Sequence, residues 1–231
     1  MSICIIPARG GSKRIPRKNI REFYGKPIIA WSIEAAKKSK LFNRVVVSTD
    51  DLEIAEVAKL YGAEVPFIRS PELADDFTGT IPVVADAIRR LHSLGHNDSE
   101  ICCLYPTAPF IIISDLRDGY ERLKSGNWSF VFSATTYSFP IFRSFQEKED
   151  GSLKMLFPEH FNTRSQDLVE SLHDAGQFYW GTAEAWLKET VIFGTKSSIV
   201  ELPRWRVQDI DCEEDWLFAE QMFIGLVTNK T

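Results

Sequence analysis

The sequence offers little material for metal or redox chemistry based on cysteine and histidine. It contains four residues of each type among 231, with no C-x-x-C pair and no paired spacing of the histidines. Because zinc sites require such spacing, we do not expect one. Three cysteines lie in short apolar runs, which indicates small core residues rather than structural disulfides. The chemistry of this chain must lie in other residues.

Long hydrophobic runs are also missing. No stretch approaches the roughly 18 apolar residues that a membrane helix requires, although 44% of the residues are hydrophobic. The first apolar segment begins at Ser2, which leaves no room for the basic and apolar regions of a signal peptide. We therefore expect a cytoplasmic protein that does not bind a membrane.

Neither of the two common nucleotide-binding motifs is present. Gly25–Lys26 is followed by Pro27 and has no glycine five residues upstream, so there is no P-loop. The dinucleotide fingerprint G-x-G-x-x-G does not occur either, which disfavours an NAD-dependent dehydrogenase. Ser12 has no histidine partner in sight, so we do not expect nucleophilic catalysis through it.

The most informative segment that is present follows the first predicted strand. Residues 3–19 read ICIIPARGGSKRIPRKN, and seven basic residues against one acid lie between Arg9 and Lys26, in a chain of net charge −5. A concentrated positive loop on an acidic protein favours a small, highly charged anion over nucleic acid. Its place after a strand is the carboxyl edge of a sheet, where open α/β folds bind ligands. The alternative is a flexible surface loop with solvated charges.

This loop has the composition of a phosphate site. Gly10 and Gly11 allow backbone N–H groups to approach a phosphate with no Cβ in the way. Arg9, Lys13 and Lys18 supply the positive charge that phosphoryl transfer requires. The sequence therefore predicts a triphosphate-binding loop.

Strand and helix patterns alternate along most of the chain. Strands are predicted at 3–7, 44–48, 64–68, 101–105, 129–135, 177–182 and 198–202, and helices at 27–39, 51–61, 81–94, 114–124, 183–188 and 213–226. Repeated strand–helix units imply a mostly parallel sheet with right-handed crossovers. We predict one α/β domain over residues 1–231, with a Rossmann-like sheet flanked by helices. The alternation stops at about 137–174, where aromatic residues, prolines and charges mix, and we expect an irregular insertion or projecting hairpins there.

A pair of aspartates near the C-terminus forms a candidate metal site. On an extended segment, Asp209 and Asp211 emerge on the same face because they are two residues apart. Two carboxylates suit Mg²⁺, which completes its octahedron with phosphate oxygens and water. In the alternative interpretation, Asp211 caps the following helix together with Glu214.

Several motifs, in the same order along most of the chain, resemble those of the CMP-sialic acid synthetase family. These are cytidylyltransferases that activate acidic keto-sugars with CTP. The matching segments are IPARGGSKRIPRKN at 6–19, STD at 48–50, RSPELADD at 69–76, LYPTAP at 104–109 and DID at 209–211. The resemblance implies that Asp209 and Asp211 hold Mg²⁺, that Arg69 helps to recognise the cytosine, and that the insertion reaches a partner subunit in a homodimer.

Two segments differ from the sialate-activating relatives. Where those proteins usually carry QPTSPLR, this chain has YPTAPFI at 105–111. The segment HDAGQFYW at 173–180 resembles the branch that activates pseudaminic acid. The alternatives are N-acetylneuraminate, legionaminate or a Kdo-like sugar, and, from another class, a catalytically silent nucleotide-binding module. Phe178, Tyr179 and Trp180 can also be read as strand core, and His173 as a hydrogen-bonded loop residue.

The expected site residues fall into three groups. Catalytic roles are expected for Arg9, Lys13, Lys18, Asp209 and Asp211. Nucleotide binding is expected for Ala8, Arg9, Gly10, Gly11, Ser12, Lys13, Lys18, Asn19, Arg69, Asp76 and Thr80, with Asn19 alternatively capping a turn. Sugar binding is expected for Tyr105, Thr107, Arg164, His173, Gln177 and Tyr179, with Arg164 or Arg143 as the cation for the sugar carboxylate.

Overall fold

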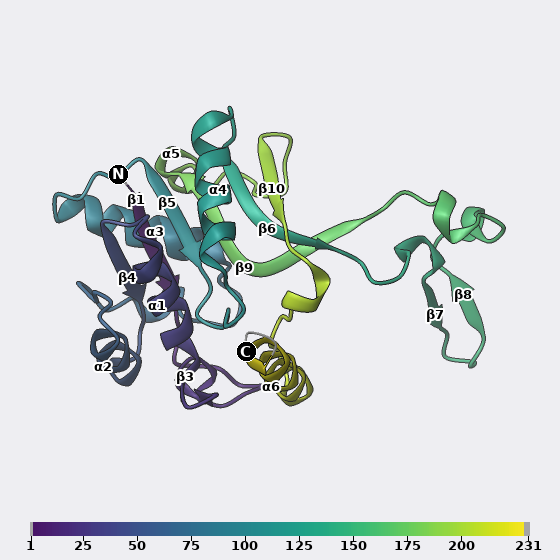
Figure 1. Ribbon diagram of the computed structural model, residues 1–231, viewed down its shortest axis with the longest axis horizontal. Helices are drawn as coiled ribbons and strands as arrows, with labels where there is room; N and C mark the ends of the chain where they lie inside the picture. Colours follow the sequence, from purple (N-terminus) through teal and green to yellow (C-terminus); the bar gives the residue numbers. More distant parts are fainter. Residues whose placement is uncertain (1, 229–231) are drawn as a thin grey trace.

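A six-stranded sheet forms the centre of the protein in the computed structural model, which describes residues 2–228 (Figure 1). Its strands come from apolar runs that are buried on both faces, as expected for the middle layer of an α/β fold. In spatial order they are β10 (Ser197–Glu201), β6 (Phe130–Thr136), β9 (Leu172–Thr182), β5 (Glu100–Leu104), β1 (Ser2–Pro7) and β4 (Arg44–Ser48).

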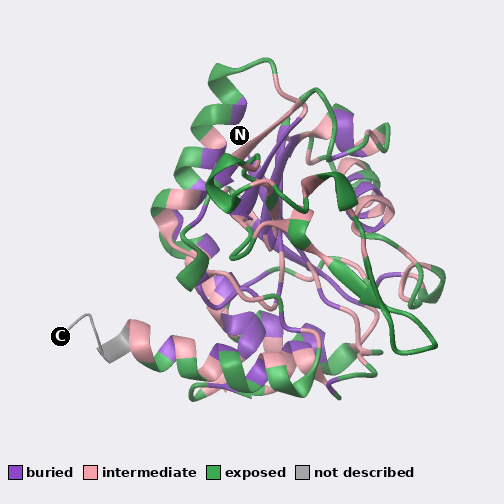
Figure 2. Cartoon of the chain, turned by 90° about the vertical axis from the view of Figure 1, so that its right-hand side faces the viewer, coloured by how far each residue is buried: buried purple, intermediate pink, exposed green. Residues whose placement is uncertain are grey.

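Helices cover both faces of this sheet because side chains alternate along each strand. In β1, Cys4 and Ile6 pack in the same buried cluster as α1 (Ile28–Ser39), α2 (Leu52–Leu60) and α4 (Ile113–Ser125). Ile3 and Ile5 point to the opposite cluster, which contains α3 (Thr80–Ser93) and α5 (Ala183–Leu187). Figure 2 shows the buried residues concentrated in the strands and on the inner helix faces.

The C-terminal helix α6 (Glu213–Thr228) forms a third, smaller core. Its Trp216 and Phe223 pack against Phe23, which follows the basic loop. Shorter elements are β2 (Glu22–Phe23), β3 (Lys26–Pro27), β7 (Phe145–Glu147), β8 (Leu153–Met155) and the 3-10 turns η1 (Lys18–Ile20), η2 (Pro71–Leu73), η3 (Ile141–Arg143), η4 (Pro158–His160), η5 (Ser165–Asp167) and η6 (Arg204–Arg206). Among residues 2–228, no helix is both long and apolar enough to cross a membrane.

The predicted fold class is confirmed, with two corrections to individual strands. Residues 64–68 make only two isolated bridges to the edge of the sheet, Val46 with Glu64 and Thr49 with Ile68, because Pro66 removes a donor from the segment. β9 begins at Leu172 and runs antiparallel to both β5 and β6. It returns from the insertion without a crossover helix, and such a connection reverses the direction of the chain.

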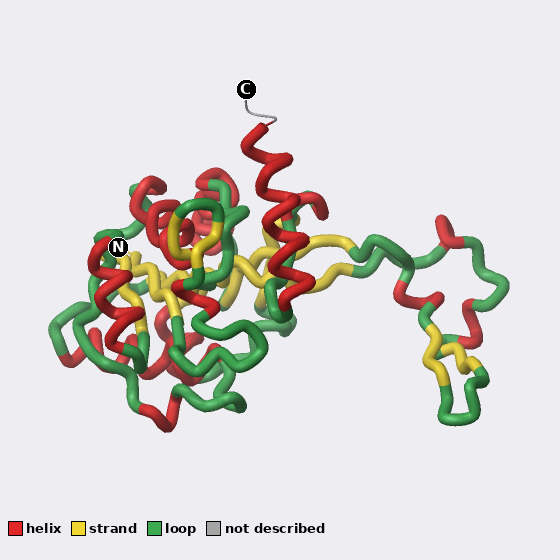
Figure 3. Tube along the Cα trace, turned by 90° about the horizontal axis from the view of Figure 1, so that it is seen from below, coloured by secondary structure: helices red, strands yellow, loops and turns green. Residues whose placement is uncertain are grey.

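The insertion between β6 and β9 projects from the body of the protein as an arm, which we define as residues 137–171 (Figures 1 and 3). It carries the antiparallel β7–β8 hairpin. The predicted boundaries of 137–174 hold except for the last three residues, which belong to β9.

The topology brings three chain segments to one edge of the sheet. β4 and β5 both run parallel to β1 and lie on either side of it. The segments that follow Pro7, Ser48 and Leu104 therefore meet at the carboxyl edge. Since the chain order reverses at β1, this edge is the topological switch point where α/β folds bind ligands.

The tight contact of α4 with the sheet gives a stability test. A Cβ on Gly119 would lie 2.7 Å from Trp180 Cδ1 and 3.0 Å from Phe178 Cε2, both in the buried core. Gly119→Ala is expected to lower the free energy of unfolding by roughly 1–3 kcal/mol in urea titration, although alanine favours helices by about 1 kcal/mol. Gly225→Ala in α6, where a Cβ meets nothing within 4 Å, is the control and is expected to stabilise. Stabilisation by Gly119→Ala would contradict the packing described here.

Candidate active site

The basic loop crosses directly above two aspartates that follow β4. The Gly10 N–H donates to Asp50 Oδ1 at 3.0 Å, and a Cβ on Gly10 would lie 2.6 Å from Asp51 Oδ2. Glycine is needed here because the backbone passes so close to Asp51. The Gly10 N–H is thus directed at Asp50 in this structure, and its expected contact with a phosphate stays a prediction. Gly11 is exposed, and a Cβ on it would meet open space.

Arg17 ties the end of the loop to α2. Its backbone is left-handed, with φ of 56°, and its guanidinium donates to Asp51 at 3.0 Å and to Glu53 at 2.6 Å. Hydrogen bonds from Arg17 lower the pKa of Asp51 to about 2, and Asp51 also accepts from the Ile54 N–H to cap α2. The loop is therefore held by charge at the N-terminus of a helix.

Two adjoining hollows open at this edge of the sheet and share Arg9, Lys18, Asn19 and Asp76. Asn19 is buried and donates to the Arg9 carbonyl at 2.9 Å, so it supports the loop from below. The first hollow is also lined by Arg69, Thr80, Tyr105 and Thr107, and the second by Ser12, Lys13, Arg14 and Asp211. Ala8 is fully buried behind them.

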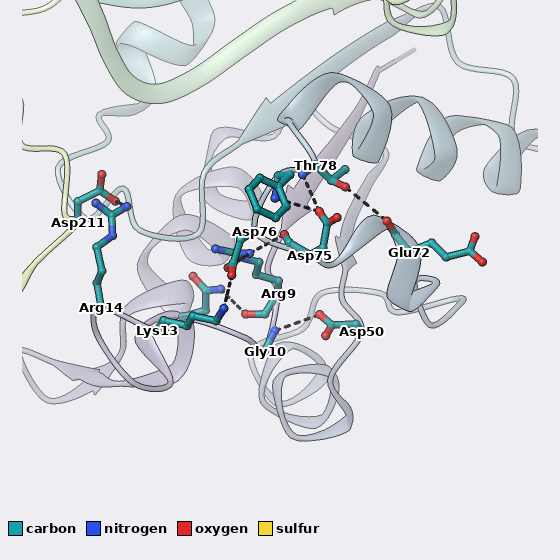
Figure 4. A network of polar contacts seen from close by, with 12 residues as sticks. Arg9, Gly10, Lys13, Arg14, Asp50, Glu72, Asp75, Asp76, Thr78 and Asp211 are labelled. Atoms are coloured by element: carbon teal, nitrogen blue, oxygen red, sulfur yellow. Dashed lines mark hydrogen bonds and ion pairs between the residues drawn. The ribbon is translucent and has the colours of Figure 1, made fainter.

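Asp76 neutralises two of the predicted phosphate ligands. Arg9 Nη1 lies 2.8 Å from Asp76 Oδ1, and Lys13 Nζ lies 2.5 Å from Oδ2 (Figure 4). Both cations lower the pKa of Asp76. The carboxylate therefore takes the place of an anionic ligand between Arg9 and Lys13. This arrangement does not suit the direct nucleotide contact expected of Asp76.

Asp211 binds the other end of the loop. Its Oδ1 lies 2.9 Å from Arg14 and 3.4 Å from Lys18, and Lys18 also donates to the Ile210 carbonyl at 2.6 Å. The helix cap is formed instead by Asp215, which accepts from the N–H groups of Asp211 and Cys212, each at 2.9 Å. The interpretation of Asp211 as the cap, with Glu214, is therefore wrong. Its carboxylate remains available to the site.

Asp209 and Asp211 are a reasonable donor set for Mg²⁺. Desolvation raises the pKa of Asp209, and the charge of Asp211 raises it further, while Lys18 lowers it. A divalent cation would relieve this accumulation of negative charge. No cluster of three or more acidic, histidine or cysteine ligands occurs within the described residues. Two carboxylates still suit Mg²⁺, because phosphates and water usually supply its other ligands.

Arg69 forms the buried floor of the first hollow. It is 3% exposed, its Nε has no partner, and its only ion pair among the described residues is to Asp50 at 3.5 Å. Burial lowers the pKa of this guanidinium. An unsatisfied buried donor at a pocket wall favours a ligand that brings an acceptor.

Some of the expected sugar-binding residues line the first hollow, and others are buried beneath its surface. Tyr105 and Thr107 line the first hollow. Gln177 and Tyr179 are only 2% and 3% exposed and lie behind it. Gln177 Nε2 donates to the Arg206 carbonyl at 2.8 Å. Both side chains are buried, and their expected direct contact with a sugar stays a prediction.

His173 and Arg164 are not brought to these hollows. His173 packs on Tyr137 at the root of the arm, with ring centroids 4.7 Å apart, and its Nδ1 lies 2.8 Å from the Asp174 carbonyl. Arg164 lies on the arm and pairs with Asp167 at 2.7 Å. The alternative interpretation of His173 as a hydrogen-bonded residue fits this geometry, but the residue lies in β9 and not in a loop. Arg143 is likewise on the arm, where it donates to the Thr163 carbonyl.

Sequence reasoning missed several residues that position the site. Asp50, Asp51 and Arg17 hold the loop, and Arg14 neutralises Asp211. The first two follow a buried strand at the ligand-binding edge, which is the signal that would have identified them.

Comparison with known proteins decides the family. A family model described as cytidylyltransferase matches residues 3–177. The chain belongs to this cytidylyltransferase family. It is 47% identical to a pseudaminic acid cytidylyltransferase of Campylobacter jejuni, over 96% of each chain. It is also 32% identical to a CMP-N,N'-diacetyllegionaminic acid synthase of Legionella pneumophila, over 95% of each chain.

The fold of this cytidylyltransferase is also seen in a solved structure. A CMP:2-keto-3-deoxy-manno-octonic acid synthetase complexed with CTP superimposes with a TM-score of 0.70 at 14% identity, covering 97% of this chain and 98% of the other. The likeness extends to the whole α/β arrangement. The chain is accordingly a nucleotidyltransferase, as the sequence predicted.

The ion pairs of Asp76 predict how this cytidylyltransferase binds CTP. A triphosphate must compete with Asp76 for Arg9 and Lys13, so Asp76→Asn is expected to tighten CTP binding. We expect a decrease in Kd of roughly two- to fivefold in calorimetric titration, since each exposed pair contributes little. Glu72→Gln removes the same charge from the same segment and is expected to change Kd less. Weaker CTP binding by Asp76→Asn would show instead that Asp76 contacts the nucleotide.

Proposed function

We propose that this cytidylyltransferase activates pseudaminic acid, converting it with CTP into CMP-pseudaminic acid and pyrophosphate. The observation that carries this proposal is the 47% identity to a pseudaminic acid cytidylyltransferase over 96% of both chains. Two features of the structure support the proposal. The cationic loop at the carboxyl edge of the sheet can bind the triphosphate, and the adjoining hollow, lined by Tyr105, can hold the sugar.

In the proposed reaction, the C2 hydroxyl of the sugar attacks the α-phosphorus of CTP. A new P–O bond forms, the bond from the α-phosphorus to the bridging oxygen breaks, and pyrophosphate leaves with that electron pair. Arg9, Lys13 and Lys18 bind the triphosphate and stabilise the charge on its oxygens. Arg69 and Asn19 line the floor on which the nucleoside lies. The chain's main contribution is positioning, since phosphoryl transfer needs little covalent help from the protein.

We further propose that Asp209 and Asp211 hold Mg²⁺. When bound, the ion supplies charge neutralisation at the phosphate oxygens. With Asp211 holding the ion, Arg14 and Lys18, which pair with it in this structure, would be free to bind phosphate oxygens. The proton of the sugar hydroxyl passes to a water molecule or to the carboxylate of Asp209 or Asp211.

The sugar identity rests on residues that differ from sialate-activating relatives. Tyr105 stands where those proteins usually carry glutamine, and it faces the first hollow. Lower identity, 32%, links the chain to a legionaminic acid synthase, so legionaminate is the second candidate. N-acetylneuraminate and a Kdo-like sugar are the remaining alternatives.

We propose that the protein is a homodimer in which the arm reaches the partner's site. The arm exposes large apolar side chains that its own chain does not cover: Tyr137, Phe139, Phe145, Leu153, Leu156, Phe161 and Val169. Such a surface is typical of an interface. Arg164 and Arg143 would then supply the cation for the sugar carboxylate in the partner subunit. Three buried free thiols suit a reducing compartment, and we propose a cytoplasmic location.

Pyrophosphate release tests the reaction. With CTP and Mg²⁺, turnover is expected with pseudaminate and much less with legionaminate, N-acetylneuraminate or Kdo. Asp209→Asn and Asp211→Asn are each expected to lower kcat/KM at least about a hundredfold, since both hold the metal. Asp118→Asn on the exposed side of α4 is the control. Turnover with N-acetylneuraminate alone would reject the sugar assignment, and binding of CTP without turnover of any sugar would favour the silent module.

Light scattering and subunit mixing test the arm. The wild-type protein is expected at twice the mass of one chain, and Leu153→Ser with Phe161→Ser is expected to shift it to the monomer. Leu60→Ser, at an exposed leucine of α2, is the control. Mixing Arg164→Ala with Asp211→Asn subunits is expected to restore activity, because one mixed site receives both intact residues. A monomeric wild type, or no recovery on mixing, would contradict the proposal.

A further inference from the structure

The two aspartates proposed to hold the metal lie on a chain segment outside the sheet. Residues 203–212 connect β10 to α6, and apart from the short turn η6 they form neither helix nor strand (Figure 1). Such a segment has no continuous ladder of backbone hydrogen bonds to fix its shape. Mg²⁺ demands near-ideal octahedral geometry from its ligands. The carboxylates on this segment therefore need support from other parts of the chain.

Arg206, the last residue of η6, attaches the segment to α4. Its side chain is buried, and its Nη1 lies 2.7 Å from Oδ2 of Asp115 in the first turn of that helix. The two side chains are only 7% and 13% exposed. The ion pair is thus largely shielded from water, and it joins the segment to a rigid element on one side.

Gln177 on β9 holds the main chain of the same residue. Its Nε2 donates to the Arg206 carbonyl at 2.8 Å. The main chain of Gln177 is itself fixed, since its N–H donates to Ser133 Oγ at 3.2 Å and its carbonyl accepts from the Tyr105 N–H at 2.9 Å. The side chain and the carbonyl of Arg206 are therefore held by two different elements. We call Asp115, Arg206 and Gln177 the clamp.

The clamp lies directly before the carboxylates of the site. Asp209 follows Arg206 by three residues, and its carboxylate lies beside the backbone of β9, where a Cβ on Gly176 would be 3.9 Å from Asp209 Oδ1. On the other side of Asp209, Ile210 is fully buried in the third core against α6. Asp209 is thus placed between two anchored residues, with only a few backbone dihedrals left between them.

Stability alone does not account for a buried ion pair at this position. The desolvation of two charges offsets most of their attraction, and apolar residues of similar volume often stabilise such a position as well or better. Hydrogen bonds between a guanidinium and a carboxylate are directional, however, and accept few geometries. The ion pair therefore selects one conformation of the segment more than it stabilises the folded state.

We propose that Arg206, held by Asp115 and Gln177, is a positioning residue that fixes Asp209 in the geometry required to bind the divalent cation. The inference rests on the proposed function, because it takes Asp209 and Asp211 as the residues that hold the metal. The role requires no contact of the clamp with the metal, the nucleotide or the sugar.

Replacement of the whole ion pair separates positioning from stability. Asp115→Leu/Arg206→Met removes both charges at once, and its urea midpoint is expected to equal or exceed that of the wild type. Mn²⁺ is used as the probe in place of Mg²⁺, and its binding to the CTP complex is followed by electron paramagnetic resonance without sugar. This binding is expected to weaken roughly tenfold, the lower end of what loss of the support behind a metal ligand costs. The Kd of CTP without metal is expected not to change.

Two further variants and a control complete the test. Gln177→Met removes the bond to the Arg206 carbonyl without leaving a buried charge, and is expected to weaken Mn²⁺ binding roughly three- to tenfold, the value of one hydrogen bond. Because no sugar is present, a sugar contact of Gln177 does not enter this measurement. Arg206→Lys keeps the charge and is expected to bind Mn²⁺ more tightly than the double variant. Glu100→Leu/Lys124→Met removes an ion pair at the other end of α4 and is expected to leave Mn²⁺ binding unchanged.

The outcomes distinguish failure of the clamp from failure of the metal site. Unchanged Mn²⁺ binding in Asp115→Leu/Arg206→Met, or an equal loss in the control, would overturn the proposal. If that variant does not fold, Gln177→Met decides in the same way. Should Asp209→Asn bind Mn²⁺ as tightly as the wild type, the metal site fails and the clamp fails with it. A loss in Asp209→Asn without a loss in the clamp variants rejects the clamp and leaves the proposed function standing.

Discussion

The arrangement of the site depends on ion pairs between one cationic loop and carboxylates from separate segments. Like charges at such density repel one another strongly where solvent is partly excluded. Asp51 after β4, Asp76 before α3 and Asp211 before α6 each bind part of the loop. These acids hold the loop in place without a ligand. Because the loop's cations are already paired with these carboxylates, an incoming triphosphate must displace carboxylates to bind the cations.

Much of the fold follows from patterns that one sequence carries. Continuous apolar runs identified the strands, and Gly62 and Gly95, both with positive φ, follow the ends of helices α2 and α3. The antiparallel direction of β9 could not be predicted from these patterns, because it depends on where the chain re-enters the sheet after the arm. The weak pairing of residues 64–68 results from Pro66. Its missing N–H removes a hydrogen-bond donor, although the neighbouring residues are apolar as in a strand.

The sequence predicted which charged residues line the site, but not which side chains lie buried behind its surface. Arg9, Lys13 and Lys18 line the hollows at the edge where strand order and composition placed them, and Arg69, expected from the family resemblance, lines the first hollow. Local sequence cannot reveal that Gly10 donates to Asp50, or that Gln177 and Tyr179 lie behind the pocket wall. Both depend on contacts between segments far apart in the chain.

A crystal structure with CTP and Mg²⁺ would locate the phosphates relative to the loop. We expect the β- and γ-phosphates between Arg9 and Lys13, with the Asp76 carboxylate displaced from both cations and Asp211 turned from Arg14 toward the metal. A triphosphate bound elsewhere, with the Arg9–Asp76 and Lys13–Asp76 ion pairs intact, would contradict this expectation.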